Sequence, residues 1–296
     1  MHAGPEDNYF KLKVYIISDA MRKNVFSGSF YSSDGRRLIS FINGAINSAS
    51  VPIEANNAVS YVAPHAGYIY SGKTAAFTYK AMLSNPDIKK VDSVIVVGPN
   101  HTGMGQPISI SYEDWETPLG ICKNDKELSK EITDSSDHIN IDEYAHENEH
   151  SIEVELPFMQ HVIPGKKFSF VCMGDQSIEA SELLTDAIIK ASEKLKRNIT
   201  IIASSDFNHY ESADIAKRKD SALLNKISIL DYKNFNKLVY ELNDSACGFG
   251  PITVAMLFAK HAGAKKGIVL RYSNSGESTG DYSSVVAYSS VAFITP

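Results

Sequence analysis

Cysteine and long apolar runs are both scarce in this sequence. The chain contains three cysteines, Cys122, Cys172 and Cys247, an odd number too widely spaced for a disulfide framework. This scarcity favours a reducing, cytoplasmic environment. No stretch approaches the roughly 18 to 20 uninterrupted apolar residues of a membrane-spanning helix. Residues 1–13 carry charges without a continuous apolar core, so we expect neither a secretory signal nor a membrane protein.

Basic residues are also fewer than acidic ones. The chain has 29 Lys and Arg against 35 Asp and Glu, and its net charge is −6. Because the basic residues form no stripe with interleaved aromatics, we expect no nucleic-acid partner. Hydrophobic residues make up 43% of the chain, which is enough to fill a sizeable core. No low-complexity linker interrupts the sequence, so we predict one domain over residues 1–296.

Three apolar segments are each soon followed by a histidine. These are residues 58–63 with His65, residues 94–97 with His101, and residues 199–203 with His209. Four consecutive apolar residues from Val94 are typical of a strand buried on both faces of a parallel sheet. In open α/β sheets, ligands bind beyond the carboxyl ends of the strands. If the three strands share one sheet, the imidazoles converge there, and neutral imidazole is a common iron, copper or zinc ligand.

Helical and strand-like patterns alternate along the chain and predict an α/β fold with parallel βαβ units. Helical spacing follows Ser33-Asp34, one of which should cap the helix. Further helices are predicted over residues 73–83, 125–133, 181–195, 214–242 and 252–261. Further strands are predicted over residues 168–173, 267–272 and 285–294, strand-like character over 9–20, an edge hairpin over 106–121 and a polar loop over 274–281.

Cys247 has two interpretations. It is either a small buried residue or a thiolate whose pKa is lowered at the start of the helix after Gly-Phe-Gly-Pro, available to a metal or as a nucleophile. Ser205, Asp206 and His209 lie too close in sequence to assemble a Ser-His-Asp triad by themselves. We expect Asp206 to orient an imidazole or bind metal, and His209 to act as an acid or base. Cys122 and Cys172 are predicted to be structural.

The acidic stretch Glu149-His150-Ser151-Ile152-Glu153 is a candidate lining of the same site. If it is helical, Glu149 and Glu153 share one face because they are four residues apart. If it is not helical, they are separate surface acids. We therefore carry Glu149, His150 and Glu153 as candidate pocket-lining residues.

Taken together, the motifs resemble the Memo family, named after a mediator of ErbB2-driven cell motility. They occur in order over nearly the whole chain. The motifs are Ser27-Gly28-Ser29-Phe30-Tyr31, Pro64-His65-Ala66-Gly67-Tyr68-Ile69-Tyr70-Ser71-Gly72, Gly98-Pro99-Asn100-His101, Glu149-His150-Ser151-Ile152-Glu153, Ser204-Ser205-Asp206-Phe207-Asn208-His209, Cys247-Gly248 and Asn274-Ser275-Gly276 with Thr279-Gly280-Asp281.

The resemblance implies a fold similar to the class III extradiol dioxygenases, a central mixed, largely parallel sheet flanked by helices. It implies a non-haem iron or copper site on His65, His101 and Cys247, with Asp206 and His209 lining the pocket. In the dioxygenases a carboxylate stands where Cys247 falls, so this site is softer and accepts Cu(I) as well as Fe(II). Prokaryotic relatives are implied partners of radical-SAM and AMMECR1-like proteins.

Our leading hypothesis is a cytoplasmic, metal-dependent redox protein, an oxidoreductase of unidentified substrate. The first alternative is a non-enzymatic protein that binds a peptide or partner in the same pocket, or that sequesters metal. The second alternative is a hydrolase with Cys247 as nucleophile and His209 as base.

Overall fold

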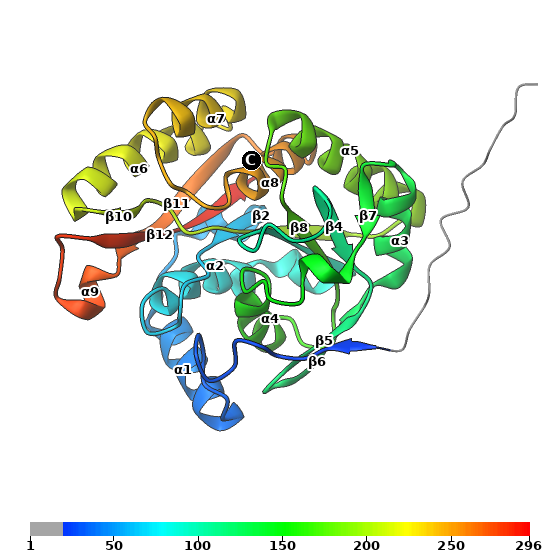
Figure 1. The fold of residues 1–296 in the computed structure, drawn as a ribbon, viewed down its shortest axis with the longest axis horizontal. Helices are drawn as coiled ribbons and strands as arrows, with labels where there is room; N and C mark the ends of the chain where they lie inside the picture. Colours follow the sequence, from blue (N-terminus) through cyan, green and yellow to red (C-terminus); the bar gives the residue numbers. More distant parts are fainter. Residues whose placement is uncertain (1–19) are drawn as a thin grey trace, which may run out of the picture.

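The computed structural model describes residues 20–296 (Figure 1). The strand-like stretch predicted over 9–20 lies almost wholly outside these residues. Every strand of the described part joins one mixed sheet of twelve strands in the order β1-β5-β6-β8-β3-β9-β2-β12-β10, with β11 beside β12, β4 beside β8 and β7 beside β4. The strands are β1 Met21–Arg22, β2 Ala58–Ala63, β3 Ser93–Pro99, β4 Ile108–Ser111, β5 Asp114–Thr117, β6 Gly120–Asn124, β7 Ile139–Ile141, β8 Lys167–Met173, β9 Ile199–Ser204, β10 His209–Glu211, β11 Lys266–Asn274 and β12 Val285–Ile294.

The centre of the sheet is parallel. Strands β8, β3, β9 and β2 run side by side in one direction, while β12 pairs antiparallel with β2. Val97 of β3 is opposite Ala203 of β9, and Ser204 of β9 is opposite Ala63 of β2. Because these strands end level with one another, the loops that follow β2 and β3 leave the sheet at the same edge. The predicted mixed, largely parallel α/β fold is confirmed.

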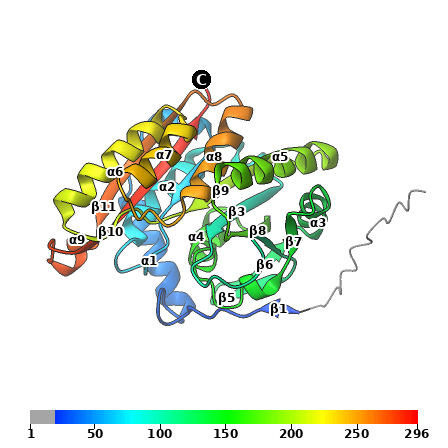
Figure 2. The ribbon, with the colours of Figure 1, turned by 45° about the horizontal axis from the view of Figure 1, so that its top comes forward.

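Helices cover both faces of the sheet (Figures 1 and 2). Helices α3, α5, α6, α7 and α8 pack on one face, and α1, α2 and α4 on the other. Alternate residues of β3 feed the two cores: Val96 belongs to the α1/α2 side, and Val97 belongs to the α5/α8 side. The helices are α1 Gly35–Ser48, α2 Gly72–Ser84, α3 Lys126–Asp134, α4 Leu156–Val162, α5 Ile178–Leu195, α6 Ala213–Ser228, α7 Tyr232–Glu241, α8 Phe249–His261 and the single turn α9 Gly276–Thr279.

Local sequence signals explain most element boundaries. Asp34 caps α1 as predicted, because its carboxylate accepts the first free backbone N–H groups of the helix. The helical stretch predicted over 214–242 is two helices. The chain turns at Leu230, whose φ is +58°, and Asp231 caps α7. Helix α9 lies inside the loop predicted over 274–281, and only β5 and β6 form the predicted hairpin.

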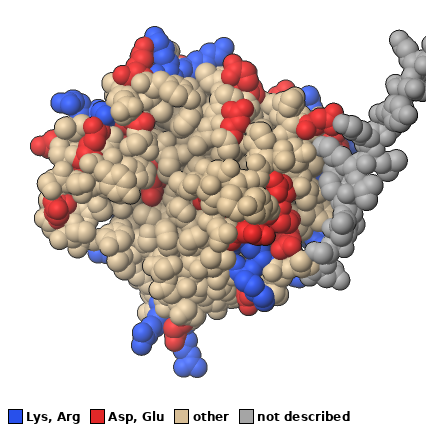
Figure 3. All heavy atoms as spheres, in the orientation of Figure 1, with Lys and Arg blue, Asp and Glu red and all other residues tan. Residues whose placement is uncertain are grey.

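The surface carries no large basic field on the face drawn in Figure 3. Lysine and arginine side chains are dispersed there, and a group of acidic side chains lies toward one side. Within the described residues, no helix combines the length and the apolar character needed to cross a bilayer.

Gly98 lies where the segment that begins at Glu149 crosses the end of β3. A Cβ at this position would lie 2.4 Å from Ser151 Oγ and 3.0 Å from Ile152 Cγ1. We expect Gly98→Ala to lower the free energy of unfolding by about 1–3 kcal/mol through overpacking, measured by urea denaturation. Gly44→Ala in α1 is the matched control, because nothing lies within 4 Å of its added Cβ and alanine favours helix. Equal stability of both variants would contradict this close approach.

Candidate metal centre

Three potential metal ligands meet beyond the carboxyl edge of the sheet. His65 follows β2, His101 follows β3, and Cys247 immediately precedes the N-cap residue of α8. One ligand atom from each lies within 4.8 Å of the other two. His65 Nε2 lies 3.3 Å from Cys247 Sγ, and the imidazoles of His65 and His101 are 5.2 Å apart between ring centroids. Residues from three distant parts of the chain therefore converge on one point.

Glu149 orients the imidazole of His101. Its carboxylate accepts the backbone N–H of His101 at 2.6 Å and lies 2.9 Å from His101 Nδ1. Ser151 donates its backbone N–H to the same carboxylate at 2.8 Å. Burial opposes ionisation, but the hydrogen bonds from His101 and Ser151 prevail and lower the pKa of Glu149 to about 2. A charged Glu149 keeps the proton on Nδ1, so the lone pair of Nε2 is free for a metal.

His65 is buried and held at two points. Its backbone N–H donates to Asp206 Oδ1 at 2.9 Å, and its Nδ1 lies 2.7 Å from Ser204 Oγ. Burial, assisted by the neighbouring imidazoles of His150 and His101, holds the pKa of His65 well below its usual range. His65 is therefore neutral, which is the protonation state that a metal requires.

Cys247 is packed against the backbone of Asp206. The backbone N–H of Asp206 donates to Cys247 Sγ at 3.3 Å, and the backbone N–H of Cys247 donates to Asp206 O at 3.2 Å. Burial raises the pKa of the Cys247 thiol well above its usual range, so the lowering that its place before α8 predicted does not occur. A bound cation would supply the charge that stabilises its thiolate.

Asp206 and His209 border this cluster without joining it. Asp206 is 4% exposed, and burial raises its pKa to about 7. His209 begins β10, where its backbone N–H donates to Ser245 Oγ at 2.7 Å. Its pKa is lowered by burial, and its Nδ1 has no hydrogen-bond partner among the described residues. Of the three strand-associated histidines, His65 and His101 have rings in contact, and His209 is near enough for its charge to lower the pKa of His65.

His150 lies against both cluster imidazoles. Its ring stacks on His101 at 4.6 Å and meets His65 edge-on at 5.2 Å, while Phe30 packs against it at 4.8 Å. Burial lowers the pKa of His150 to about 4, so it is neutral near pH 7. Ligand atoms of His101, Glu149 and His150 also lie within 4.8 Å of one another. Glu149 is already engaged by three donors, so we interpret this second group as support for His101.

Glu153 points away from the cluster. Its carboxylate binds Arg22 Nη1 at 2.6 Å and the hydroxyl of Tyr31 at 2.6 Å. Glu149 and Glu153 are both fully buried, so their interpretation as surface acids is wrong. The alternative of a shared helical face is also wrong, because only a 3-10 turn over Glu153–Glu155 forms here. No sequence motif pointed to Arg22, whose Nε also donates to His146 O at 2.7 Å.

The other two cysteines are structural, as predicted. Cys122 and Cys172 are free and fully buried, each within the core on the α1/α2 side of the sheet.

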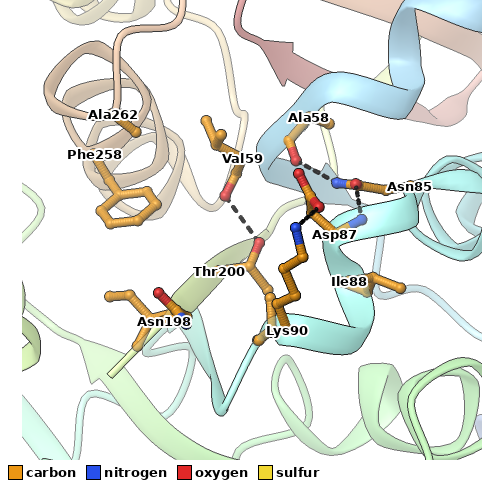
Figure 4. A pocket seen from close by; sticks show the side chains of 12 residues that line it. Ala58, Val59, Asn85, Asp87, Ile88, Lys90, Asn198, Thr200, Phe258 and Ala262 are labelled. Atoms are coloured by element: carbon orange, nitrogen blue, oxygen red, sulfur yellow. Dashed lines mark hydrogen bonds and ion pairs between the residues drawn. The ribbon is translucent and has the colours of Figure 1, made fainter. Parts of the chain in front are cut away.

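A separate cavity of about 280 Å³ opens at the amino ends of β2 and β9, at the opposite edge of the sheet (Figure 4). Several of its polar groups are already paired with each other. Asn85 donates to Ala58 O at 2.7 Å, and Lys90 lies 2.7 Å from Asp87. The residues with chemical capacity therefore gather at the carboxyl edge and not in this cavity.

The buried side chain of His146 should make the stability of the fold depend on pH. His146 is fully buried, neither of its ring nitrogens has a hydrogen-bond partner within residues 20–296, and burial beside Arg22 lowers its pKa to about 3. Between that value and the usual 6.5, the unfolded chain binds a proton that the folded chain excludes, so stability falls as pH falls.

We expect His146→Phe to gain stability over the parent by up to about 1.4 kcal/mol per pH unit as pH falls from about 6 to 4. Parallel plots of unfolding free energy against pH for the two metal-free proteins would show that His146 is not buried in its neutral form.

Comparison with known proteins places this chain in a family. The family model described as "Memo-like protein" matches residues 22–292. A MEMO1 family protein of Nitrosopumilus maritimus is 39% identical over 281 residues, covering 93% of this chain and all of the relative. Another from Sulfolobus acidocaldarius is 42% identical over 282 residues, covering 90% of this chain and 97% of the relative. A third, from Methanosarcina barkeri, is 36% identical over 92% of this chain and 99% of the relative. With matches of this length and identity, the chain belongs to the Memo-like protein family.

Proposed function

We propose that this protein holds a redox-active iron or copper ion on His65, His101 and Cys247 and acts as a metal-dependent redox protein of the cytoplasm. The observation that carries the proposal is the convergence of two imidazoles and one thiol, within 4.8 Å of one another, from three separate loops. A structural role alone does not require three such side chains to face each other. Their mutual approach is the geometry that a single cation needs.

The donor set fits these metals. Both histidines have their Nδ1 atoms engaged, His101 by Glu149 and His65 by Ser204, which directs their Nε2 atoms to the ligand position. Imidazole suits iron and copper, and a thiolate adds softness that favours Cu(I) and iron over magnesium or calcium. When bound, such a metal supplies one-electron chemistry and a positive charge that polarises a substrate or dioxygen.

In this proposal, the residues around the cluster transfer protons and limit the access of water. Burial raises the pKa of Asp206 to about 7, so this carboxyl can exchange a proton near neutral pH. Burial lowers the pKa of His209, and its Nδ1 has no hydrogen-bond partner among the described residues, so His209 offers a neutral imidazole that can accept a proton. His150 and Phe30 form an aromatic wall that limits water on one side of the cluster. In this proposal, Asp206 and His209 move protons while the histidines and Cys247 hold the metal.

A metal-sequestering role is the second candidate, and Cys247 favours it. A thiolate among the ligands strengthens retention of a soft metal without any need for a substrate. A hydrolase with Cys247 as free nucleophile is less favourable, because burial raises the pKa of its thiol. Oxygen consumption by the loaded protein with catechols or thiols separates the redox role from sequestration.

Metal analysis tests the site directly. After anaerobic purification and supply of Fe(II) or Cu(I), we expect near-stoichiometric metal in the parent protein and its loss in Cys247→Ser and His101→Ala. His138→Ala is the matched control, because His138 is exposed and lies outside the cluster. Absence of metal from the parent, or equal metal in all four proteins, would refute the centre.

Glu149→Gln tests the orientation of His101. The amide keeps the size of the side chain but removes the charge that holds the proton on His101 Nδ1. We expect metal affinity to fall by about 10–100-fold, measured by competition with a chromophoric chelator. An unchanged affinity would mean that Glu149 only packs against the site.

A further inference from the structure

The hydroxyl of Ser204 has three close polar neighbours. His65 Nδ1 lies at 2.7 Å, the backbone carbonyl oxygen of Ser151 at 2.7 Å, and Glu155 Oε1 at 2.9 Å. Ser204, His65, Ser151 and Glu155 are all buried at 1% exposure or less. Bulk water is therefore excluded from this group, and the protons must be distributed among these atoms themselves.

The number of donors and acceptors around Ser204 determines which atom carries each proton. A serine hydroxyl has one proton to donate and two lone pairs that accept. The carbonyl of Ser151 can only accept, so at 2.7 Å the proton of Ser204 must point to it. Both lone pairs of Ser204 Oγ then face His65 and Glu155, and each of these groups must bring its own proton.

The other proton arrangements leave unfavourable contacts. If Ser204 donated to an ionised Glu155, its lone pairs would face the Ser151 carbonyl oxygen at 2.7 Å with no proton between them. If Glu155 were ionised while Ser204 donated to Ser151, two acceptors would oppose each other at 2.9 Å. A buried polar group without its hydrogen bond is costly, so both arrangements are disfavoured.

The surroundings of Glu155 agree with a neutral acid. Its second oxygen, Oε2, accepts the hydroxyl proton of Tyr79, which is itself fully buried. No lysine or arginine among the described residues forms an ion pair with it. Burial raises the pKa of Glu155 to about 8, so the protonated form prevails at neutral pH.

We propose that Glu155 is a protonated carboxylic acid that donates to Ser204 and, through it, fixes His65 with its proton on Nδ1. Glu155 is a positioning residue: it touches neither Nε2 of His65 nor Cys247. Its relevance to metal binding rests on the proposed metal centre, whereas the two proton positions do not. The chain from Tyr79 to His65 does not reach solvent, so it holds protons in place and does not conduct them.

One ionised acid and one protonated acid thus orient His101 and His65, respectively. Glu149 is ionised and contacts His101 directly, whereas Glu155 is neutral and acts on His65 through a hydroxyl. His65 is consequently the less electron-rich imidazole of the pair. A neutral Glu155 also spares the buried site a second fixed negative charge in addition to that of Glu149.

Infrared difference spectroscopy of the metal-free protein at about pH 6 tests the proton on Glu155. We expect the parent to show a carbonyl stretching band of a protonated carboxyl, sensitive to deuteration, that disappears in Glu155→Gln. Glu149→Gln is the matched control, and the band should persist in it because Glu149 is ionised. A spectrum in which Glu155→Gln removes only a carboxylate band would overturn the proposal.

Nitrogen-15 NMR of the same metal-free proteins reads the tautomer of His65. We expect the Nδ1–H form in the parent and in Glu155→Gln, since an amide can still donate to Ser204 and accept from Tyr79. In Ser204→Ala the preference for this form should be reduced. An Nε2–H form in the parent, or one that appears on Glu155→Gln, would refute the positioning role.

Measurements of metal affinity then test whether these proton positions affect the metal cluster. We expect Glu155→Gln to stay close to the parent and Glu155→Leu, which cannot donate, to lose about 10–100-fold in affinity for Fe(II) or Cu(I). A loss in Glu155→Gln as large as in Glu155→Leu would overturn the neutral-donor role. Failure of the parent to bind metal refutes the metal centre alone, because the infrared and NMR results stand without metal.

Discussion

The burial of three acidic side chains in the segment 149–155 is the constraint on which the site depends. Glu149, Glu153 and Glu155 are each exposed by 1% or less, in a part of the sequence that looks like a solvated acidic loop. Burying a carboxyl group is costly unless it is ionised and paired or neutral and hydrogen-bonded. Each of the three satisfies this requirement with a different partner, and together they fasten the segment across the carboxyl edge of the sheet.

The three acids contact different partners because the segment is irregular. A turn followed by a 3-10 helix directs Glu149 toward His101, Glu153 toward Arg22 and Tyr31, and Glu155 toward Ser204 and Tyr79. A regular helix would have placed Glu149 and Glu153 on one face. Glu149 orients His101, and Glu155 positions His65 through Ser204. Glu153 anchors the segment to Arg22, near the start of the described chain. The candidate ligands are therefore arranged before any metal arrives.

The architecture was largely predictable because its signals are local. The valine run from Val94 identifies a strand buried on both faces, and strand alignment then brings His65 and His101 to one edge. The nature of the acidic stretch was not predictable in the same way. Arg22 and Glu153 are 131 positions apart, and Ser204 and Glu155 are 49 apart, so no spacing in the sequence connects them. The raised pKa of Cys247 also depends on tertiary burial, which outweighs the local effect of the helix start.

In the proposed centre, two imidazole nitrogens and one thiolate sulfur hold one metal ion. X-ray absorption spectroscopy of the anaerobically loaded protein, at the edge of the bound iron or copper, measures this ligand set most directly. We predict one sulfur scatterer from Cys247 and the multiple-scattering pattern of two imidazoles. A shell of nitrogen and oxygen alone, without sulfur and with no change on Cys247→Ser, would contradict the assignment.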